Sequence, residues 1–251
     1  MSNNTQSGHV ESSTAPNPAE PNPAEPSALV ESLFPAGVAA AELRAPGDLA
    51  LLDPEEALIV ARAVPKRVGE FAAGRLCARS ALARFGIVSF AVRAAPDRRP
   101  LWPAGLVGSI THTQGFCAAV IGEHARFVGL GLDTENAAAV SPKLWPSICV
   151  AEELAWIASL PAEERTRAAT LVFAAKEAFY KCQYPSTREW LSFSDLRIVP
   201  LEWAMLQGSF QVEVQRASDV FAAQRSGSPH ALRTAYRFHE DFVSAGVALL
   251  R

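Results

Sequence analysis

The chain has 251 residues, of which 49% are hydrophobic and 20% charged, so it can bury a sizeable core and is not disordered throughout. Its 23 Lys and Arg residues against 26 Asp and Glu residues give a formal net charge of −3, which argues against nucleic acid as a partner, since such binders usually carry a basic excess. No apolar run approaches the roughly 20 residues of a membrane-spanning helix, and the N-terminus lacks the pattern of a secretory signal, so no membrane association is expected.

The first 26 residues differ in composition from the rest: they are rich in Ser, Asn, Pro and Ala and contain the pentapeptide PNPAE twice in tandem. Such a segment cannot bury enough apolar area to offset the entropy of ordering it. We therefore expect a disordered tail over residues 1–27, either a dispensable extension or a docking segment.

After the tail, a strand is predicted over residues 37–43. An Asp-Pro pair at residues 53–54 is a typical helix start and predicts a helix over residues 54–64. The apolar spacing that follows predicts a second helix over residues 65–85, ended by a glycine.

Three strands are predicted next, and they could form an antiparallel meander. They span residues 106–112, 116–121 and 126–135. The remaining elements are helices over residues 154–159 and 162–183 and strands over residues 210–214, 233–238 and 242–250. This order predicts an α+β fold with two halves, residues 28–126 and 127–251, and an active site between them.

The four cysteines are scattered, and none lies within three positions of another, so there is no CxxC metal or redox motif. They are Cys77, Cys117, Cys149 and Cys182. This pattern is typical of buried, reduced cysteines in a cytoplasmic protein, with disulfides as the alternative.

The strand over residues 126–135 places two carboxylates on one face. Alternation puts Asp133 and Glu135 together with Phe127, Gly129 and Gly131, and the glycines would leave open space beside the acids. Two acids on one face repel each other unless a cation lies between them, and Mg²⁺ favours such oxygen ligands. A solvated strand end is the alternative.

Helix 162–183 carries charges among many apolar residues. Glu177 and Lys181 are four residues apart and so share a face, and Lys176 precedes them. Charges in a half-buried setting are costly unless they are paired or functional. A surface salt bridge is the alternative.

Three further residues are candidates for binding an anion. Arg67 and Arg75 are eight residues apart on a helix, a rotation of roughly 80°, so both guanidinium groups could converge on one anion. His112 ends a predicted strand, where a structural histidine is the alternative.

Taken in order, five segments resemble the motifs of the 4'-phosphopantetheinyl transferases, most closely the branch with the D component of enterobactin synthase, its actinobacterial relatives and the surfactin-type enzymes. The segments are KRVGEFAAGRLCAR (66–79), RPLWP (99–103), GSITH (108–112), GLDTE (131–135) and FAAKEAFYK (173–181). The resemblance covers about residues 34–200, and the last two segments are its most specific part.

The resemblance implies two pseudo-symmetric α/β halves with coenzyme A in the cleft between them. It implies an enzyme that moves the 4'-phosphopantetheine arm of coenzyme A to a serine of an apo acyl, peptidyl or aryl carrier protein and releases adenosine 3',5'-bisphosphate. Mg²⁺ or Mn²⁺ would be required, and the enzyme would be a cytoplasmic monomer. Siderophore, nonribosomal-peptide and polyketide carriers all present such a serine, so the physiological carrier stays open.

The resemblance also implies site residues. The metal-binding acids correspond to Asp133, Glu135 and Glu177, and the lysines near the pyrophosphate to Lys176 and Lys181. Glu177 is the expected base for the serine hydroxyl, directly or through a water, and Lys181 would stabilise or protonate the leaving oxygen.

The remaining implied contacts are to the phosphates and adenine of coenzyme A. His112 corresponds to a catalytic-site histidine that contacts a phosphate, and Arg67 and Arg75 to arginines that hold the 3'-phosphate. The adenine contact stays open among Arg93, Arg98 and Arg99, and Arg99 is our choice. One departure is Thr134, where an apolar residue is frequent in the family; its side chain should face away from the carboxylates.

Two rival functions remain. A non-catalytic module that binds coenzyme A or a carrier protein could use the same fold, but it would not need Asp133, Glu135, Glu177 and Lys181 all intact. An unrelated Mg²⁺-dependent nucleotide hydrolase would need a glycine-rich phosphate loop, and the sequence contains no GxxxxGK[ST].

Overall fold

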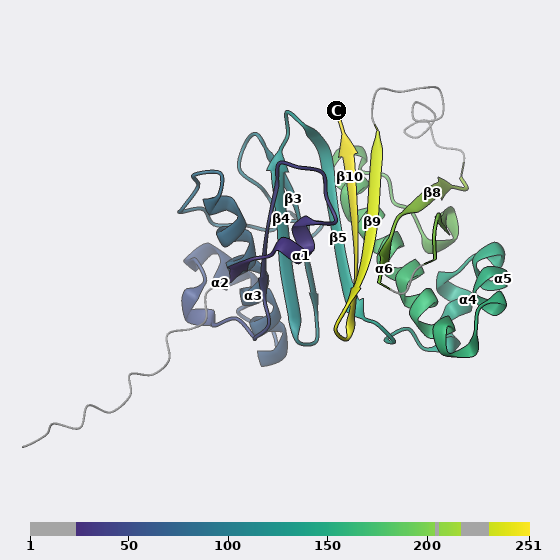
Figure 1. Ribbon diagram of the computed structural model, residues 1–251. Helices are drawn as coiled ribbons and strands as arrows, with labels where there is room; N and C mark the ends of the chain where they lie inside the picture. The colour runs from purple at the N-terminus through teal and green to yellow at the C-terminus, as the bar shows by residue number, and fades with distance from the viewer. Residues whose placement is uncertain (1–23, 204–205, 217–230) are drawn as a thin grey trace, which may run out of the picture.

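The computed structural model describes residues 24–203, 206–216 and 231–251, so most of the expected tail lies outside the described residues. Two antiparallel sheets stand side by side near the centre of the molecule, with helices on the outer sides (Figure 1). The predicted α+β fold is confirmed.

The N-terminal sheet has the strand order β1-β2-β4-β3, and all neighbours are antiparallel. Its strands are β1 (Glu25–Pro26), β2 (Val38–Leu43), β3 (Leu106–Thr113) and β4 (Phe116–Glu123). The helical elements of this part are α1 (Ala28–Glu31), η1 (Leu49–Leu51), α2 (Pro54–Val60) and α3 (Pro65–Ala83). Helix α3 covers the sheet through fully buried residues such as Ala78 and Leu82.

The described part of the chain begins within the segment predicted to be a tail. Glu25 and Pro26 pair with Glu42 and Ala41 at the edge of β2, a position that tolerates proline because the missing N–H faces away from the sheet. The second PNPAE repeat therefore ends in a strand, and the expected tail boundary at residue 27 lies too far along the chain.

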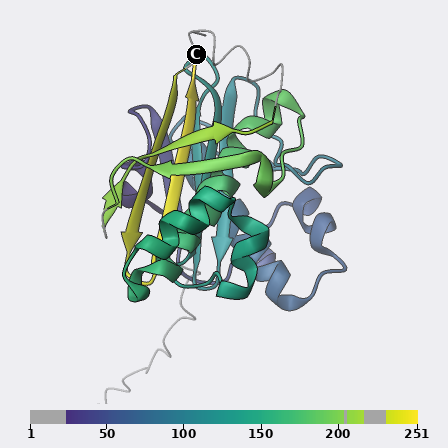
Figure 2. The same cartoon turned by 90° about the vertical axis from the view of Figure 1, so that its right-hand side faces the viewer.

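The C-terminal sheet has the strand order β5-β10-β9-β7, and a separate two-stranded ribbon joins β6 to β8. The strands are β5 (Phe127–Asn136), β6 (Leu196–Pro200), β7 (Gln207–Gly208), β8 (Phe210–Val214), β9 (Leu232–His239) and β10 (Phe242–Leu250). The helical elements are η2 (Pro142–Leu144), α4 (Trp145–Ile148), α5 (Ala151–Ser159), α6 (Ala162–Thr187) and η3 (Phe193–Asp195). Figure 2 shows these helices and the β6–β8 ribbon in front of β9 and β10.

The predicted meander is wrong in its third strand. β3 and β4 form the expected hairpin, but β5 pairs with β10 rather than with β4. β5 instead lies beside β3 through side chains: the hydroxyls of Ser109 and Thr111 accept the backbone N–H groups of Leu132 and Thr134, at 3.1 and 2.9 Å. These hydroxyls take the place of a backbone ladder and join the two sheets.

The face assigned to Phe127 was also wrong. The register of β5 against β10 shifts between Leu249 and Leu250, which leaves Val128 as an extra residue in a bulge. Phe127 therefore lies in the same core cluster as Leu130 and Leu132, against the N-terminal sheet, rather than beside the carboxylates. That cluster draws on both sheets, so the two parts of the chain share a core.

Gly129 and Gly131 do not leave open space. A Cβ on Gly131 would come within 1.8 Å of the Ala178 carbonyl oxygen, and one on Gly129 within 2.2 Å of the Cys182 carbonyl oxygen. The glycines let α6 lie directly on β5, which brings the charged face of α6 to the acidic end of the strand.

All four cysteines are buried and unpaired, as predicted. In the described part of the chain, no helix is both long and apolar enough to cross a membrane.

Candidate active site

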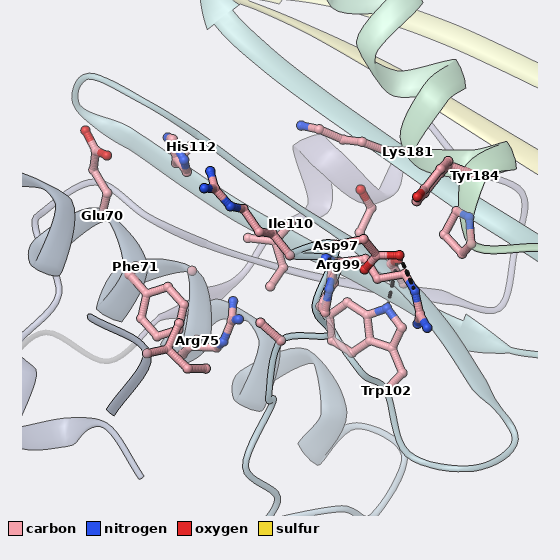
Figure 3. Close-up of a pocket in the computed structure, with 18 of the residues that line it drawn as sticks. Glu70, Phe71, Arg75, Asp97, Arg99, Trp102, Ile110, His112, Lys181 and Tyr184 are labelled. Atoms are coloured by element: carbon pink, nitrogen blue, oxygen red, sulfur yellow. Dashed lines mark hydrogen bonds and ion pairs between the residues drawn. The ribbon is translucent and has the colours of Figure 1, made fainter. Parts of the chain in front are cut away.

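A cavity of about 780 Å³ opens between the two parts of the chain, bordered by α2, α3, β3, the segment before β3 and α6 (Figure 3). Its lining includes the predicted residues Arg67, Arg75, Arg99, His112 and Lys181. Residues that lie more than 110 positions apart in the sequence therefore meet in one cavity, four cations and an imidazole among them.

Arg75 is a buried cation with no carboxylate in ion-pair contact among the residues that the structure describes. Its side chain is only 6% exposed, its guanidinium lies 4.1 Å from the centre of the Phe71 ring, and its Nε has no hydrogen-bond partner. Burial lowers the pKa of Arg75 to about 10, although Glu56 acts in the opposite direction. A desolvated charge of this kind at a cavity wall indicates a site for an anion.

Arg67 and His112 lie next to each other at the cavity edge. The Arg67 Nη1 is 2.8 Å from the His112 Nε2, and because an arginine can only donate, His112 accepts through a neutral nitrogen. Burial and the Arg67 charge lower the pKa of His112, which keeps the ring neutral. Arg67 also lies 3.5 Å from Glu70.

Lys181, a lining residue of the cavity, forms an ion pair with Asp133. The Lys181 Nζ lies 2.6 Å from the Asp133 Oδ1 and donates to the Leu132 carbonyl oxygen at 3.2 Å. Thr111 also donates to that carboxylate oxygen, at 3.3 Å. The other oxygen, Oδ2, is buried and has no hydrogen-bond partner in the described part of the chain, so no donor there satisfies its lone pairs.

Glu135 and Glu177 complete a group of three interacting carboxylates. Burial and the neighbouring Asp133 raise the pKa of Glu135 to about 7. Burial also raises the pKa of Glu177, with Lys181 opposing and Asp133 adding to the rise. Acids that raise one another's pKa need a cation to stay ionised together.

The donor set suits a hard divalent cation, because it consists of carboxylate oxygens with one buried oxygen unsatisfied. However, among the described residues no three His, Cys, Asp or Glu side chains are arranged so as to hold a metal ion. The Lys181 ammonium supplies the positive charge beside Asp133.

Lys176 does not belong to this cavity, and its expected contact with a pyrophosphate is wrong. The side chain is fully buried, and its Nζ donates to Glu153 at 2.7 Å and to the carbonyl oxygens of Ile148 and Phe193 at 2.8 and 2.9 Å. Five residues along a helix rotate by roughly 140°, so Lys176 and Lys181 point to different sides of α6.

Thr134 faces away from the carboxylates, as expected. Its hydroxyl lies 2.7 Å from the Ser244 hydroxyl, which lies 2.9 Å from the His239 Nε2. All three side chains are buried. The hydroxyl that departs from the family pattern is thus satisfied within the core.

Several cavity residues were missed by the sequence reasoning. Tyr180 and Tyr184 stack with ring centroids 5.1 Å apart, and Trp190 meets Tyr180 edge-on at 5.3 Å; all three line the cavity. An aromatic pair four residues apart around Lys181 was the available signal. Asp97, another lining residue, carried no signal of its own.

Together, these observations describe an α+β protein with an arginine- and lysine-lined cavity between two sheets, next to interacting carboxylates. Sequence comparison adds the family. The profile of the 4'-phosphopantetheinyl transferase N-terminal domain matches residues 54–122, and that of the 4'-phosphopantetheinyl transferase superfamily matches residues 129–235.

Two relatives found by sequence agree with these matches. The 4'-phosphopantetheinyl transferase Npt of Nocardia iowensis is 37% identical over 171 residues, covering 68% of this chain and 76% of Npt. PptT of Mycobacterium tuberculosis is 39% identical over 184 residues, with 68% and 76% covered. A holo-(acyl-carrier-protein) synthase structure from Bacillus anthracis is 20% identical with a TM-score of 0.39, covering 50% of this chain and 98% of that one. The chain belongs to the 4'-phosphopantetheinyl transferase family.

Proposed function

We propose that this protein is a 4'-phosphopantetheinyl transferase that moves the phosphopantetheine arm of coenzyme A to a serine of an apo carrier protein. The observation that carries the proposal is the convergence of Arg67, Arg75, His112 and Lys181 on one cavity, in a chain of this family. Coenzyme A carries a pyrophosphate and a 3'-phosphate, so its site needs clustered cations even in a protein without a basic excess.

Arg67 and Arg75 are the proposed ligands of the 3'-phosphate. Arg75 is already desolvated without an ion partner, so a phosphate would gain a charge-assisted contact without displacing a carboxylate. His112 is neutral and accepts from Arg67 through Nε2, so it carries its proton on Nδ1 and can donate to a phosphate from that nitrogen. Arg99 lines the same cavity and is the proposed contact for adenine.

Lys181 and Glu177 are the proposed catalytic residues. The Lys181 ammonium lines the cavity and can stabilise charge on the leaving phosphate oxygen or protonate it. Glu177 has a raised pKa, which suits a base that takes the proton of a serine hydroxyl near neutral pH. The serine oxygen then attacks the phosphorus that carries the pantetheine arm, and adenosine 3',5'-bisphosphate leaves.

Asp133, Glu135 and Glu177 are the proposed holders of Mg²⁺, with Mn²⁺ as a substitute. Among the described residues no three acids are already arranged to hold a metal ion, so the proposal requires these three side chains to draw together when the metal binds. The unpartnered Asp133 Oδ2 and the raised pKa of Glu135 support a cation there. When bound, the metal would neutralise charge on the pyrophosphate.

The proposed partners are apo acyl or peptidyl carrier proteins, including those of siderophore, nonribosomal-peptide and polyketide assembly. We also propose that the protein acts as a monomer, as the family resemblance implies. Four buried, unpaired thiols support a reducing compartment such as the cytoplasm.

The test is intact-mass analysis of a panel of apo carrier proteins after incubation with the protein, coenzyme A and Mg²⁺. We expect a mass increase of one phosphopantetheine group, and none when the acceptor serine is replaced by alanine. A protein that binds coenzyme A but modifies no carrier would favour the binding-module alternative instead.

A further inference from the structure

An ion pair joins the segment before β3 to the C-terminal end of α6. The Arg188 Nη1 lies 3.0 Å from the Asp97 Oδ2. The same carboxylate also binds Arg99, whose Nε lies 3.2 Å from Oδ2 and whose backbone N–H donates to Oδ1 at 3.3 Å. Asp97 and Arg99 line the cavity (Figure 3). The pair, which we call the clasp, therefore ties one cavity wall to the helix that forms another.

The backbone is strained on both sides of the clasp. Three non-glycine residues in the described part of the chain have a left-handed φ, namely Arg98 at 69°, Arg188 at 60° and Glu240 at 49°. Arg188 forms the clasp, and Arg98 directly follows Asp97. A left-handed residue at a helix C-terminus is usually glycine, and strain kept at a non-glycine residue points to a functional constraint.

The charges at the clasp are arranged to keep Asp97 ionised at the wall of a cavity that is also lined by Arg67, Arg75 and Lys181. Desolvation works against the charge, but the Arg99 N–H and the charges of Arg99 and Arg188 hold the pKa of Asp97 below its ordinary value. A lone carboxylate here would repel a phosphate. Because Asp97 is paired with the guanidinium groups of both Arg99 and Arg188, its charge is compensated and it links the two arginines.

We propose that the Asp97–Arg188 clasp holds the two cavity walls together around bound coenzyme A and slows its release, while Asp97 aims Arg99 into the cavity. This inference rests on the proposed function, because it takes coenzyme A as the occupant. The two side chains of the clasp are 30% and 48% exposed, so the pair can open and close at small cost.

The experiment measures the dissociation rate of coenzyme A by stopped-flow displacement in the full chain. Arg188→Gly removes the clasp and suits the left-handed backbone, so its thermal stability should equal or exceed that of the parent. Asp97→Asn removes the charge from the other side. Each change should speed dissociation by about twofold to fivefold at low salt, the range of an exposed ion pair, and the difference should shrink at high salt.

Three further variants sharpen the result. Arg188→Lys keeps the charge and should stay close to the parent rate. The double variant of Asp97→Asn with Arg188→Gly should dissociate no faster than the faster single variant, because both remove one interaction. Glu213→Gln breaks a comparable exposed pair with Arg197 on the β6–β8 ribbon, at 3.1 Å, and should change nothing.

Unchanged dissociation in both single variants would overturn the clasp, as would fully additive effects in the double variant. A parent protein that binds no coenzyme A would refute the proposed function and the clasp with it. Coenzyme A binding with unaltered release in the variants would refute the clasp alone.

Discussion

Replacing Arg75 by methionine should stabilise the free protein and weaken its binding of coenzyme A. The buried guanidinium has its pKa lowered to about 10, and a base with a lowered folded-state pKa costs stability at every pH below that value. At about 1.4 kcal/mol per pH unit, the cost is roughly 3 kcal/mol. The contact with the Phe71 ring offsets about 1 kcal/mol, so the variant should gain about 2 kcal/mol in free energy of unfolding at pH 7.

The affinity of the Arg75→Met variant for coenzyme A should fall. A hydrogen bond to a charged group contributes about 1.5–3 kcal/mol, so the Kd for coenzyme A should rise roughly 10-fold to 150-fold. The Kd for 3'-dephospho-coenzyme A should hardly change, because that ligand lacks the phosphate assigned to Arg67 and Arg75.

Thermal unfolding and calorimetric titration with both ligands check the two halves of this prediction. Arg233→Met, an exposed arginine on β9, is the matched control and should alter neither quantity. An Arg75→Met protein that loses the same affinity for both ligands would refute the 3'-phosphate assignment. A less stable variant would refute the claim that Arg75 is kept for binding.

Three other changes have distinct expected outcomes. Asp133→Ala should abolish transfer while circular dichroism stays native, and full activity at low Mg²⁺ would contradict the metal assignment. Glu135→Gln should have a higher Tm than the parent, by a margin that grows as pH rises from about 4.5 to about 7. The folded-state pKa of Glu135 is raised to about 7, so the parent protein loses stability over that window and the variant does not. Parallel Tm-against-pH profiles would contradict this assignment. Lys176→Met should cost about 3–5 kcal/mol in unfolding free energy by leaving Glu153 buried and unpaired. A stable Lys176→Met protein with a high KM for coenzyme A would instead restore Lys176 as a ligand.

Local patterns predicted most of the secondary structure. The Asp-Pro start of α2 holds as a reciprocal cap, in which the Asp53 side chain accepts from Glu55 and Glu56 accepts the Asp53 N–H. The helix ends at Val60, four residues earlier than expected. Short elements such as β6 and α4 were not predicted, because four or five residues show too little hydrophobic periodicity.

Partner choice between strands was harder to predict, because it depends on contacts distant in sequence. β5 follows β4 in the chain but pairs with β10, and the hydroxyls that join it to β3 are ordinary strand residues when read locally. The bulge at Val128 likewise leaves no mark in the sequence. It nevertheless moves Phe127 to the other face.

Site residues were likewise predictable from local spacing but not from contacts distant in sequence. Spacing on one helix correctly brought Arg67 and Arg75 to one cavity. The same spacing argument, applied strictly, separates Lys176 from Lys181. Helical spacing could not predict that Glu153, which lies on another helix, forms a buried ion pair with Lys176.

The measurement that most directly tests the account is single-turnover transfer by Glu177→Gln, with coenzyme A and an apo carrier protein both saturating. If Glu177 is the base, the rate should fall by about 10²–10⁴, while the Kd for coenzyme A stays near that of the parent because Arg67, Arg75 and Lys181 are intact. Raising Mg²⁺ should restore little of the rate. Recovery to near the parent rate at high Mg²⁺ would contradict the base role and leave Glu177 as a metal ligand, and an unimpaired rate at all Mg²⁺ concentrations would contradict the assignment of the catalytic site.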